Sequence, residues 1–232
     1  MRVATRDTLA GLLLGALETR GLRTAIGFLA AYGVASRLTP KNVDTTKLCP
    51  VVGEGELGFT IEELRRRGLL VPVGENEVRL ELGLDGEWSE IRQRLLRYDL
   101  VLGQWPSVPP WDEPERSLRK GVLLFNSHLF FEVHEVLEPQ WLTRNGREKE
   151  FLQGLIQIAV AFHHLERENV EGTRSLLGEG LLKTRRHAPS FLRVEVQKFS
   201  ARLEECESLL LKENDRNARK SVFALIPKME LV

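Results

Sequence analysis

The chain has 232 residues, of which 42% are hydrophobic and 28% charged, a composition typical of a globular protein with a sizeable core. Its 33 Lys and Arg balance 33 Asp and Glu, so it lacks the basic surplus that nucleic-acid-binding proteins usually carry. The two cysteines, Cys49 and Cys206, form no metal or redox spacing, which is typical of a reducing compartment. We therefore expect a cytoplasmic protein without a disulfide framework.

The N-terminal part predicts a small α+β domain over residues 1–102. Leu9 to Leu17 is apolar but far shorter than the roughly 20 residues of a membrane span, so we interpret it as part of a buried helix. Gly21 separates two Ala- and Leu-rich helices, and Thr60 is a candidate N-cap for a third. The expected elements are helices at 6–19 and 22–37, a loop at 38–58, a helix at 60–67, a β-hairpin at 69–72 and 78–82, and a helix at 89–100.

The remainder predicts a helical bundle. The stretch 103–114 carries four prolines and no periodicity, and it is the expected linker. A bundle over 115–213 and a charged tail over 214–232 follow, so the predicted fold class is mainly α, a helical bundle preceded by a small α+β domain with one hairpin. The expected bundle helices cover 115–138, 147–168, 170–186 and 189–213, the last with an apolar seam at Val196, Phe199, Leu203, Cys206 and Leu210. Such a short seam is typical of an intramolecular contact, although an oligomer stays open.

The order helix, helix, helix, hairpin is also that of a winged helix, in which Arg65, Arg66 and Arg67 would lie near DNA. Two observations oppose this interpretation. The gap before the third helix is about twenty residues, whereas a helix-turn-helix needs three or four. Residues 1–112 carry 14 Lys and Arg against 15 Asp and Glu, a net charge of −1. We favour a solvated surface helix and keep binding of nucleic acid through residues 60–82 as the alternative.

Four of the five histidines fall within residues 125–169. On a helical wheel at about 100° per residue, His134 and Glu138 lie inside an aromatic stripe, which predicts that they face the core. The wheel places His128, Glu132 and Glu135 on an adjoining flank, and Pro139 predicts that the helix kinks or ends near Glu138.

The following helix predicts a second polar stripe within an apolar segment. Gln153, Gln157 and His164 share one face, while His163 points about 100° away. Because buried polar groups need partners, we expect this stripe to face His134 and Glu138.

Two interpretations of these polar residues remain open. In the first, His134, Glu138 and His164, with Glu135 as a further candidate, bind a divalent metal such as Zn, Mn or Fe between helices. In the second, the same residues form a hydrogen-bonded network that orients the helices, without metal or turnover.

The segments FNSHLFFEVHEVLEPQW, FLQGLIQIAVAFHHLERENVEG and LLGEGL resemble the domain-of-unknown-function family numbered 309, over about residues 115–185. The family motif His-x-x-x-Glu-x-x-Trp or Tyr falls on His134, Glu138 and Trp141. The resemblance implies an all-helical bundle and a metal-binding role for this His and Glu. It implies no established activity, although such proteins are sometimes labelled metal-dependent hydrolases, and it does not extend to residues 1–110.

The sequence thus leaves two classes of function open, and with them whether the chain is an enzyme. The first is a metal-binding bundle with hydrolytic chemistry, in which His134 and Glu138 are ligands and Glu135 or Glu132 is the base for a metal-bound water. In it, Trp141, Gln153, Gln157 and His128 surround the site. The second is a non-enzymatic regulator or adaptor, whose first domain binds nucleic acid or protein and whose bundle is a scaffold or a small-ligand pocket.

Overall fold

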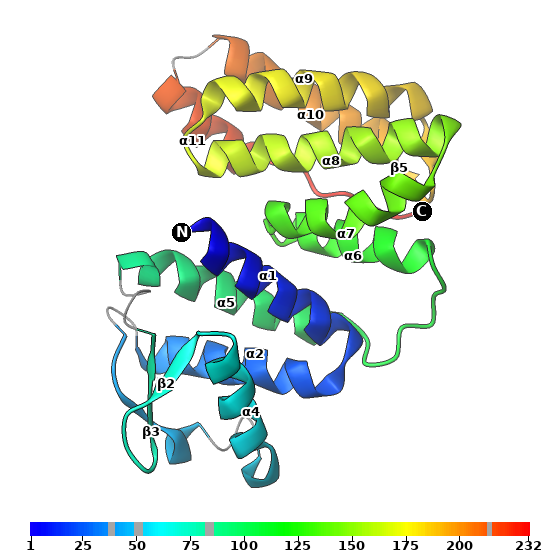
Figure 1. Cartoon of the computed structure of the whole chain (residues 1–232). Coiled ribbons are helices and arrows are strands. Elements are labelled where there is room, and N and C mark those ends of the chain that lie inside the picture. Colours follow the sequence, from blue (N-terminus) through cyan, green and yellow to red (C-terminus); the bar gives the residue numbers. More distant parts are fainter. Residues whose placement is uncertain (37–39, 49–52, 82–85, 213–214) are drawn as a thin grey trace. The chain divides into compact units, whose positions relative to one another are not determined.

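The computed structural model describes residues 1–36, 40–48, 53–81, 86–212 and 215–232. The chain divides into two compact units, Met1–Pro109 and Pro110–Val232, and the division falls within the proline-rich stretch 103–114. Helices dominate both units, and the sheets are small and antiparallel (Figure 1). The predicted fold class, mainly α with a small β-containing region, is confirmed. No helix among these residues is long and apolar enough to cross a membrane.

The N-terminal unit is organised around its second helix, which packs against the first, the α4 and the α5 helices. Its core includes an edge-to-face contact of Tyr32 with Trp88, whose ring centroids are 5.6 Å apart. The elements are α1 (Val3–Glu18), α2 (Arg20–Ala35), β1 (Val43–Asp44), η1 (Thr45–Lys47), α4 (Glu54–Arg66), β2 (Leu70–Pro72), β3 (Glu77–Leu80) and α5 (Trp88–Gln104).

The predicted hairpin is confirmed, and it belongs to a larger sheet. Strands β2 and β3 pair antiparallel, and β1 adds to the other edge of β3, which gives the order β1-β3-β2. Strand β1 and the short helix η1 lie within the stretch predicted as a loop, so that prediction is wrong for residues 43–47; residues 38, 39 and 49–52 lie outside the described part. A two-residue strand is too short to show an alternating pattern in the sequence.

Two predicted boundaries in this unit are also wrong. Helix α4 begins at Glu54, so Thr60 is a fully buried residue inside the helix and not its N-cap. The contacts of helix α4 with α2 override the low helix propensity of Gly55 and Gly58. The break between the first two helices lies at Thr19, whose φ is −126°, while Gly21 is already part of α2.

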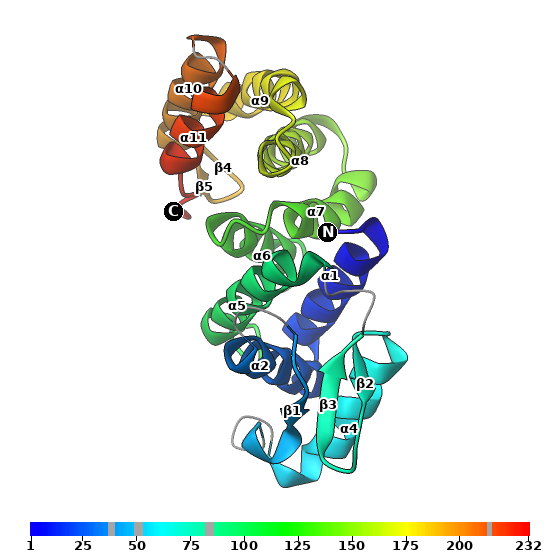
Figure 2. The same ribbon diagram turned by 90° about the vertical axis from the view of Figure 1, so that its left-hand side faces the viewer.

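The C-terminal unit is a succession of helices in which each packs on the next, from α6 to α11. Figure 2 views α8 and α9 nearly end-on, side by side. The elements are α6 (Glu115–Asn126), α7 (Phe130–Thr143), α8 (Gly146–Glu166), α9 (Val170–Thr184), η3 (Arg185–His187), β4 (Ser190–Phe191), β5 (Val194–Glu195), α10 (Val196–Lys212) and α11 (Asp215–Leu225).

The single helix predicted over 115–138 is two helices. The chain turns at His128, whose φ of +55° is left-handed, and this turn brings Phe125 and Phe130 into an edge-to-face contact at 5.3 Å. The sequence predicts a kink or an end near Glu138; helix α7 continues through Pro139 to Thr143, so the end is wrong and the kink stays a prediction. The predicted helix 189–213 begins only at Val196, because residues 190–195 form the β4–β5 hairpin.

The last residues of the chain pack on the bundle. The seam predicted on α10 is confirmed, since all five of its residues are buried. Beyond α11, the amide of Asn126 forms two hydrogen bonds with the backbone of Met229, at 2.9 and 2.8 Å. Leu231 pairs with Val194 of β5, and the Val232 amide donates to the Arg193 carbonyl at 2.7 Å. The tail therefore holds the β4–β5 hairpin.

Candidate functional site

His134 lies at the edge of α7 and does not face the core. Its side chain is 28% exposed, and those of Glu135 and Glu138 are 40% and 45% exposed. The core-facing side of α7 is centred on Val133 and Leu137, both fully buried. At about 100° per residue, the midpoint between Val133 and Leu137 lies roughly 80° around the helix from His134. The prediction that His134 and Glu138 face the core is therefore wrong.

The imidazole of His134 is oriented by the two carboxylates. Its Nδ1 lies 3.0 Å from Oε1 of Glu135, and its Nε2 lies 3.8 Å from Oε2 of Glu138. When Nδ1 carries the proton and donates to Glu135, the lone pair of Nε2 faces the Glu138 carboxylate. Two electron-rich atoms in this position are stabilised by a proton on Nε2 or by a cation beside them.

Glu132, the other predicted base, is fully buried. Its carboxylate is engaged by other groups of the protein and is not free. A base for a metal-bound water must reach that water, directly or through one other molecule. Burial therefore separates Glu132 from the solvent-exposed edge where His134 lies.

The polar residues of α8 do not form the stripe opposite His134 that the sequence predicts. Gln157 faces α9, where its amide donates to Glu179 at 2.7 Å and accepts from Lys183 at 2.8 Å. His164 is bonded at 3.0 Å to the side chain of Asn169, the N-cap of α9. Burial, together with the neighbouring positive charge of His163, lowers the pKa of His164.

The histidine of α8 that contacts α7 is His163. Its ring lies 5.8 Å from that of Phe131, and its Nδ1 lies 3.3 Å from a carboxylate oxygen of Glu166. Phe131 also stacks on His134, with ring centroids 6.5 Å apart. An aromatic ring thus bridges two histidines from neighbouring helices, a contact that the sequence patterns did not predict. The position of Phe131, three residues before His134, is the signal that could have indicated it.

The other predicted surrounding residues are dispersed. His128 lies in the α6–α7 turn, with its ring 5.5 Å from that of Phe130. Gln153 is half-buried on α8. Trp141 is also half-buried, with the ammonium of Lys149 5.0 Å from its ring, and its buried indole N–H has no hydrogen-bond partner within the described structure.

These donors do not form a closed metal site. Within the described ranges, no group of three His, Cys, Asp or Glu side chains is arranged to hold a metal ion. His134, Glu138 and His164 therefore do not come together as three ligands. Structural and catalytic zinc sites commonly use three or four protein ligands, so this arrangement does not fit such a site. The metal site stays a prediction.

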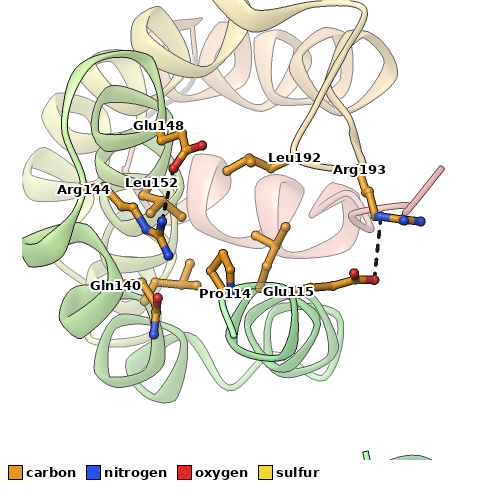
Figure 3. A pocket seen from close by; sticks show the side chains of 10 residues that line it. Pro114, Glu115, Gln140, Arg144, Glu148, Leu152, Leu192 and Arg193 are labelled. Carbon is orange, nitrogen blue, oxygen red and sulfur yellow. Dashed lines mark ion pairs between the residues drawn. The ribbon is translucent and has the colours of Figure 1, made fainter. Parts of the chain in front are cut away.

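A pocket of about 140 Å³ opens between α6, α7, α8 and the β4–β5 turn (Figure 3). Its walls are apolar, formed mainly by leucine side chains from each of these four segments. The lining residues are Pro114, Glu115, Leu118, Leu137, Gln140, Arg144, Glu148, Leu152, Leu192 and Arg193.

Two ion pairs border this pocket. Arg144 lies 3.6 Å from Glu148, and Arg193 lies 3.7 Å from Glu115. Both distances exceed those of a charge-assisted hydrogen bond, which are about 2.7–2.9 Å. Glu115 also accepts a shorter bond, 2.8 Å, from Arg119. Charged groups thus surround an apolar interior, an arrangement typical of small-molecule sites.

The β4–β5 turn over the pocket has a strained backbone. Leu192 and Arg193 both have left-handed φ angles, +46° and +62°. This conformation costs a residue other than glycine roughly 1–2 kcal/mol. The pairing of β4 with β5 and the bond from Val232 to Arg193 hold the turn in place. The surrounding structure therefore keeps both side chains at the pocket.

This pocket is not apparent in the sequence as a set of residues. Its lining comes from segments between Pro114 and Arg193 that meet only in the folded chain. Each segment alone reads as an ordinary apolar helix face or a turn, so no local pattern marks it.

Comparisons with known proteins find one family to which part of the bundle is similar. The model of the family described as "Domain of unknown function (DUF309)" matches residues 118–176. A protein of Aquifex aeolicus (strain VF5), named "Uncharacterized protein", is 28% identical over 89 residues, which are 38% of this chain and 27% of that protein. The chain thus matches about a quarter of that relative's length. No solved structure matches the chain significantly. The matched residues 118–176, which run from α6 into α9, lie within the stretch of about residues 115–185 in which the sequence resembles the same family.

Proposed function

We propose that this protein is a non-enzymatic regulator or adaptor whose C-terminal bundle binds a small apolar ligand. The observation that supports the proposal is the pocket of Figure 3, with leucine walls and a charged border. Its volume of about 140 Å³ is close to that of an engineered apolar cavity of about 150 Å³ that binds benzene. A ligand group of that size would gain roughly 25 cal/mol for each Å² of apolar surface it buries.

The chemistry of the lining favours binding over turnover. None of the ten described lining residues is a Ser, Thr, Cys or His, the usual nucleophiles and proton-transfer groups of enzymes. Its carboxylates, Glu115 and Glu148, are each neutralised by an arginine. The pocket therefore offers apolar surface and fixed charges to a ligand.

Toluene is a suitable first probe, observed through the methyl resonances of the pocket leucines. We expect saturable shifts of these methyl groups and their loss in Leu192→Trp, since this half-buried side chain reaches the pocket from a turn. Leu211→Trp, at a residue 72% exposed on α10, is the matched control and should bind normally. Absence of saturable binding in the wild type would contradict the proposal, as would unchanged binding in Leu192→Trp.

We also propose a second function, in which His134 and Glu138 bind a divalent cation at the surface of α7. The observation that favours it is the contact of Glu135 with Nδ1, since a carboxylate on one ring nitrogen is the usual support of a histidine that ligates metal through the other. Two ligands one helical turn apart would leave the remaining positions to water. A bound Zn, Mn or Fe ion would supply Lewis acidity there.

Metal analysis of the purified protein tests this second proposal. We expect stoichiometric metal in the wild type, its loss in His134→Ala and Glu138→Gln, and its retention in the control His128→Ala. Added Zn, Mn or Fe should raise the thermal stability of the wild type but not that of His134→Ala or Glu138→Gln. A wild type that carries no metal and gains no stability from these ions contradicts it.

For the N-terminal unit we propose recognition of a protein partner rather than nucleic acid. The sheet order β1-β3-β2, with β1 before α4 and the β2–β3 hairpin after it, favours a winged-helix-like arrangement. However, Arg65 and Arg66 are both bonded to Glu62, at 2.8 and 3.0 Å, and these bonds lower the pKa of that carboxyl to about 2. Arg67 is paired with Glu63 at 2.8 Å. These arginines are thus matched by carboxylates on their own helix, which weakens any attraction to phosphates.

Salt-dependent DNA binding distinguishes these partners. We expect the protein to bind DNA weakly and without sequence preference. Replacing Arg65, Arg66 and Arg67 by glutamine should leave this DNA binding unchanged. Tight binding that these replacements abolish would favour nucleic acid instead.

A further inference from the structure

We propose that the ligand of the C-terminal pocket is a small carboxylic acid anion with a hydrocarbon chain or ring. The hydrocarbon part lies against the leucines, and the carboxylate binds Arg144. This inference rests on the pocket being a binding site, as proposed above, and adds the chemical class of its ligand. Three features carry it: the availability of the Arg144 guanidinium, the charge balance around the pocket, and the pocket's size.

Arg144 has hydrogen-bonding capacity to spare. Its contact with Glu148 is a 3.6 Å ion pair, whereas Arg119 and Arg186 in the same unit form bonds of 2.8 and 2.7 Å with their glutamates. Among the residues that the structure describes, the Arg144 side chain makes no hydrogen bond. A guanidinium has five N–H donors in a planar fork that matches a carboxylate. In Figure 3, this guanidinium points toward the centre of the lining residues.

A second donor lies beside Arg144. Gln140, one turn earlier on α7, lines the same pocket. Its amide nitrogen is 3.4 Å from the hydroxyl oxygen of Ser117, a long contact that a charged acceptor would replace at little cost. The guanidinium of Arg144 can bind both oxygens of one carboxylate, and Gln140 adds a further polar group at the same border of the pocket.

The charge balance around the pocket also favours an anion. Glu115 is shared by Arg119 and Arg193, and Glu148 faces Arg144. The four charged groups that line the pocket sum to zero, and Arg119, which lies outside the lining but shares Glu115, brings the net charge of the five groups to +1. A ligand with one carboxylate neutralises this excess, whereas an ammonium group increases it. Arg193 points away from the centre of the pocket in Figure 3, which leaves Arg144 as the residue that would meet the anion.

The volume limits the hydrocarbon part. About 140 Å³ suits a phenyl ring or a branched chain of similar size, and four leucines line the pocket. Isocaproate, a branched six-carbon carboxylate, is therefore a fitting probe. Isocaproamide keeps its shape without the charge, and acetate keeps the charge without the hydrocarbon.

The test is calorimetric titration of the full-length protein with these three probes. We expect isocaproate to bind at least about tenfold more tightly than isocaproamide, and acetate not to saturate. In Arg144→Gln, isocaproate should lose this advantage while isocaproamide binds as in the wild type. Arg202→Gln, at a surface arginine of α10 whose side chain is 54% exposed, is the control and should keep the wild-type preference. Circular dichroism establishes that each variant is folded.

The outcomes separate the two proposals. Equal binding of isocaproate and isocaproamide to the wild type overturns the carboxylate inference while the apolar pocket stands. A preference for isocaproate that persists in Arg144→Gln also overturns it, because Arg144 would not be the group that binds the anion. If toluene and all three probes fail to bind, the pocket is not a ligand site and both proposals fall.

Discussion

Cys206 lies on the inner face of α10, fully buried, with its sulfur 3.7 Å from the carbonyl oxygen of Leu225 in α11. Burial is the main cause that raises the pKa of this thiol from 9.0 to about 11, and the neighbouring carboxylate of Glu205 adds to it. A thiolate at this position would lose its hydration without gaining a partner. The residue is therefore a packing element of the α10–α11 contact, and it resists alkylation while the protein is folded.

This shift predicts a loss of stability at alkaline pH. Between about pH 9 and pH 11 the unfolded chain releases the Cys206 proton and the folded chain keeps it, so unfolding becomes more favourable as pH rises. The full effect is at most about 3 kcal/mol, since one pKa unit corresponds to about 1.4 kcal/mol. Urea unfolding of Cys49→Ser, with and without Cys206→Ala, measures it over this range. Identical pH dependence in the two proteins would contradict the prediction.

Asn126 joins the end of α6 to the C-terminal tail. The side-chain nitrogen of Asn126 donates to the backbone carbonyl of Met229, and its side-chain oxygen accepts from the backbone N–H of Met229. Because both backbone groups lose their partner in Asn126→Ala, we expect a loss of about 1–3 kcal/mol in unfolding free energy. Amide hydrogen exchange should accelerate at Met229 and Val232.

Asn145→Ala is the matched control for this substitution. Asn145 is exposed, and its side chain makes no capping hydrogen bond at the start of α8. Equal effects of the two substitutions would show that the Asn126 contact does not fix the tail.

At the scale of elements, α8 and α9 approach closely where two glycines face each other. A Cβ on Gly180 would lie 2.8 Å from the carbonyl oxygen of Gly154 and 2.8 Å from Cγ1 of Ile158. Because one of these neighbours is backbone, only separation of the helices would make room. Gly180→Ala should therefore destabilise the bundle by about 1–3 kcal/mol, the usual cost of overpacking.

Gly11 of α1 provides the opposite case. A Cβ there would meet nothing within 4 Å, so Gly11→Ala should stabilise its helix by roughly 0.5–1 kcal/mol. Urea denaturation of both variants measures the two changes. A neutral or stabilising effect of Gly180→Ala would contradict the close approach of α8 and α9.

The elements that the sequence predicts well are those with a strong period. The seam of α10 and the β2–β3 hairpin follow from local spacing, and both are confirmed. The break at His128 does not follow, since a left-handed residue without glycine leaves no local signal. The orientation predicted for α7 is wrong because a wheel of apolar residues assigns the charged Glu132 to the outside, whereas the folded chain buries this side chain fully.

The two candidate sites also differ in how far the sequence predicts them. The motif of His134, Glu138 and Trp141 is local and therefore visible in the sequence, although the surroundings of its members depend on the folded chain. The pocket is not visible, because its borders come from Glu115, Arg144 and Arg193, which only tertiary packing brings together. Spacing along one helix reports which side chains share a face, but not which other segment covers that face.

At the scale of the whole molecule, the two units have separate cores. The N-terminal core is built around α2, and the C-terminal core around a set of phenylalanines in which Phe125 contacts Phe130, Phe162 and Phe199. The proposed ligand pocket and the DUF309 match both lie in the C-terminal unit. A unit with its own core is expected to fold alone.

We therefore expect residues 110–232 to fold without the N-terminal unit. Expressed alone, they should be helical, unfold cooperatively on heating and bind toluene with the affinity of the full chain, because every residue that lines the pocket and every contact that holds the β4–β5 turn belongs to them. The fragment 110–212 is the informative comparison. It lacks α11 and the tail that bonds Asn126 and Arg193, so its turn should loosen and its affinity should fall while its helices persist. If residues 110–232 unfold without cooperativity, the bundle depends on the N-terminal unit for its stability, and the adaptor would be a single folding unit.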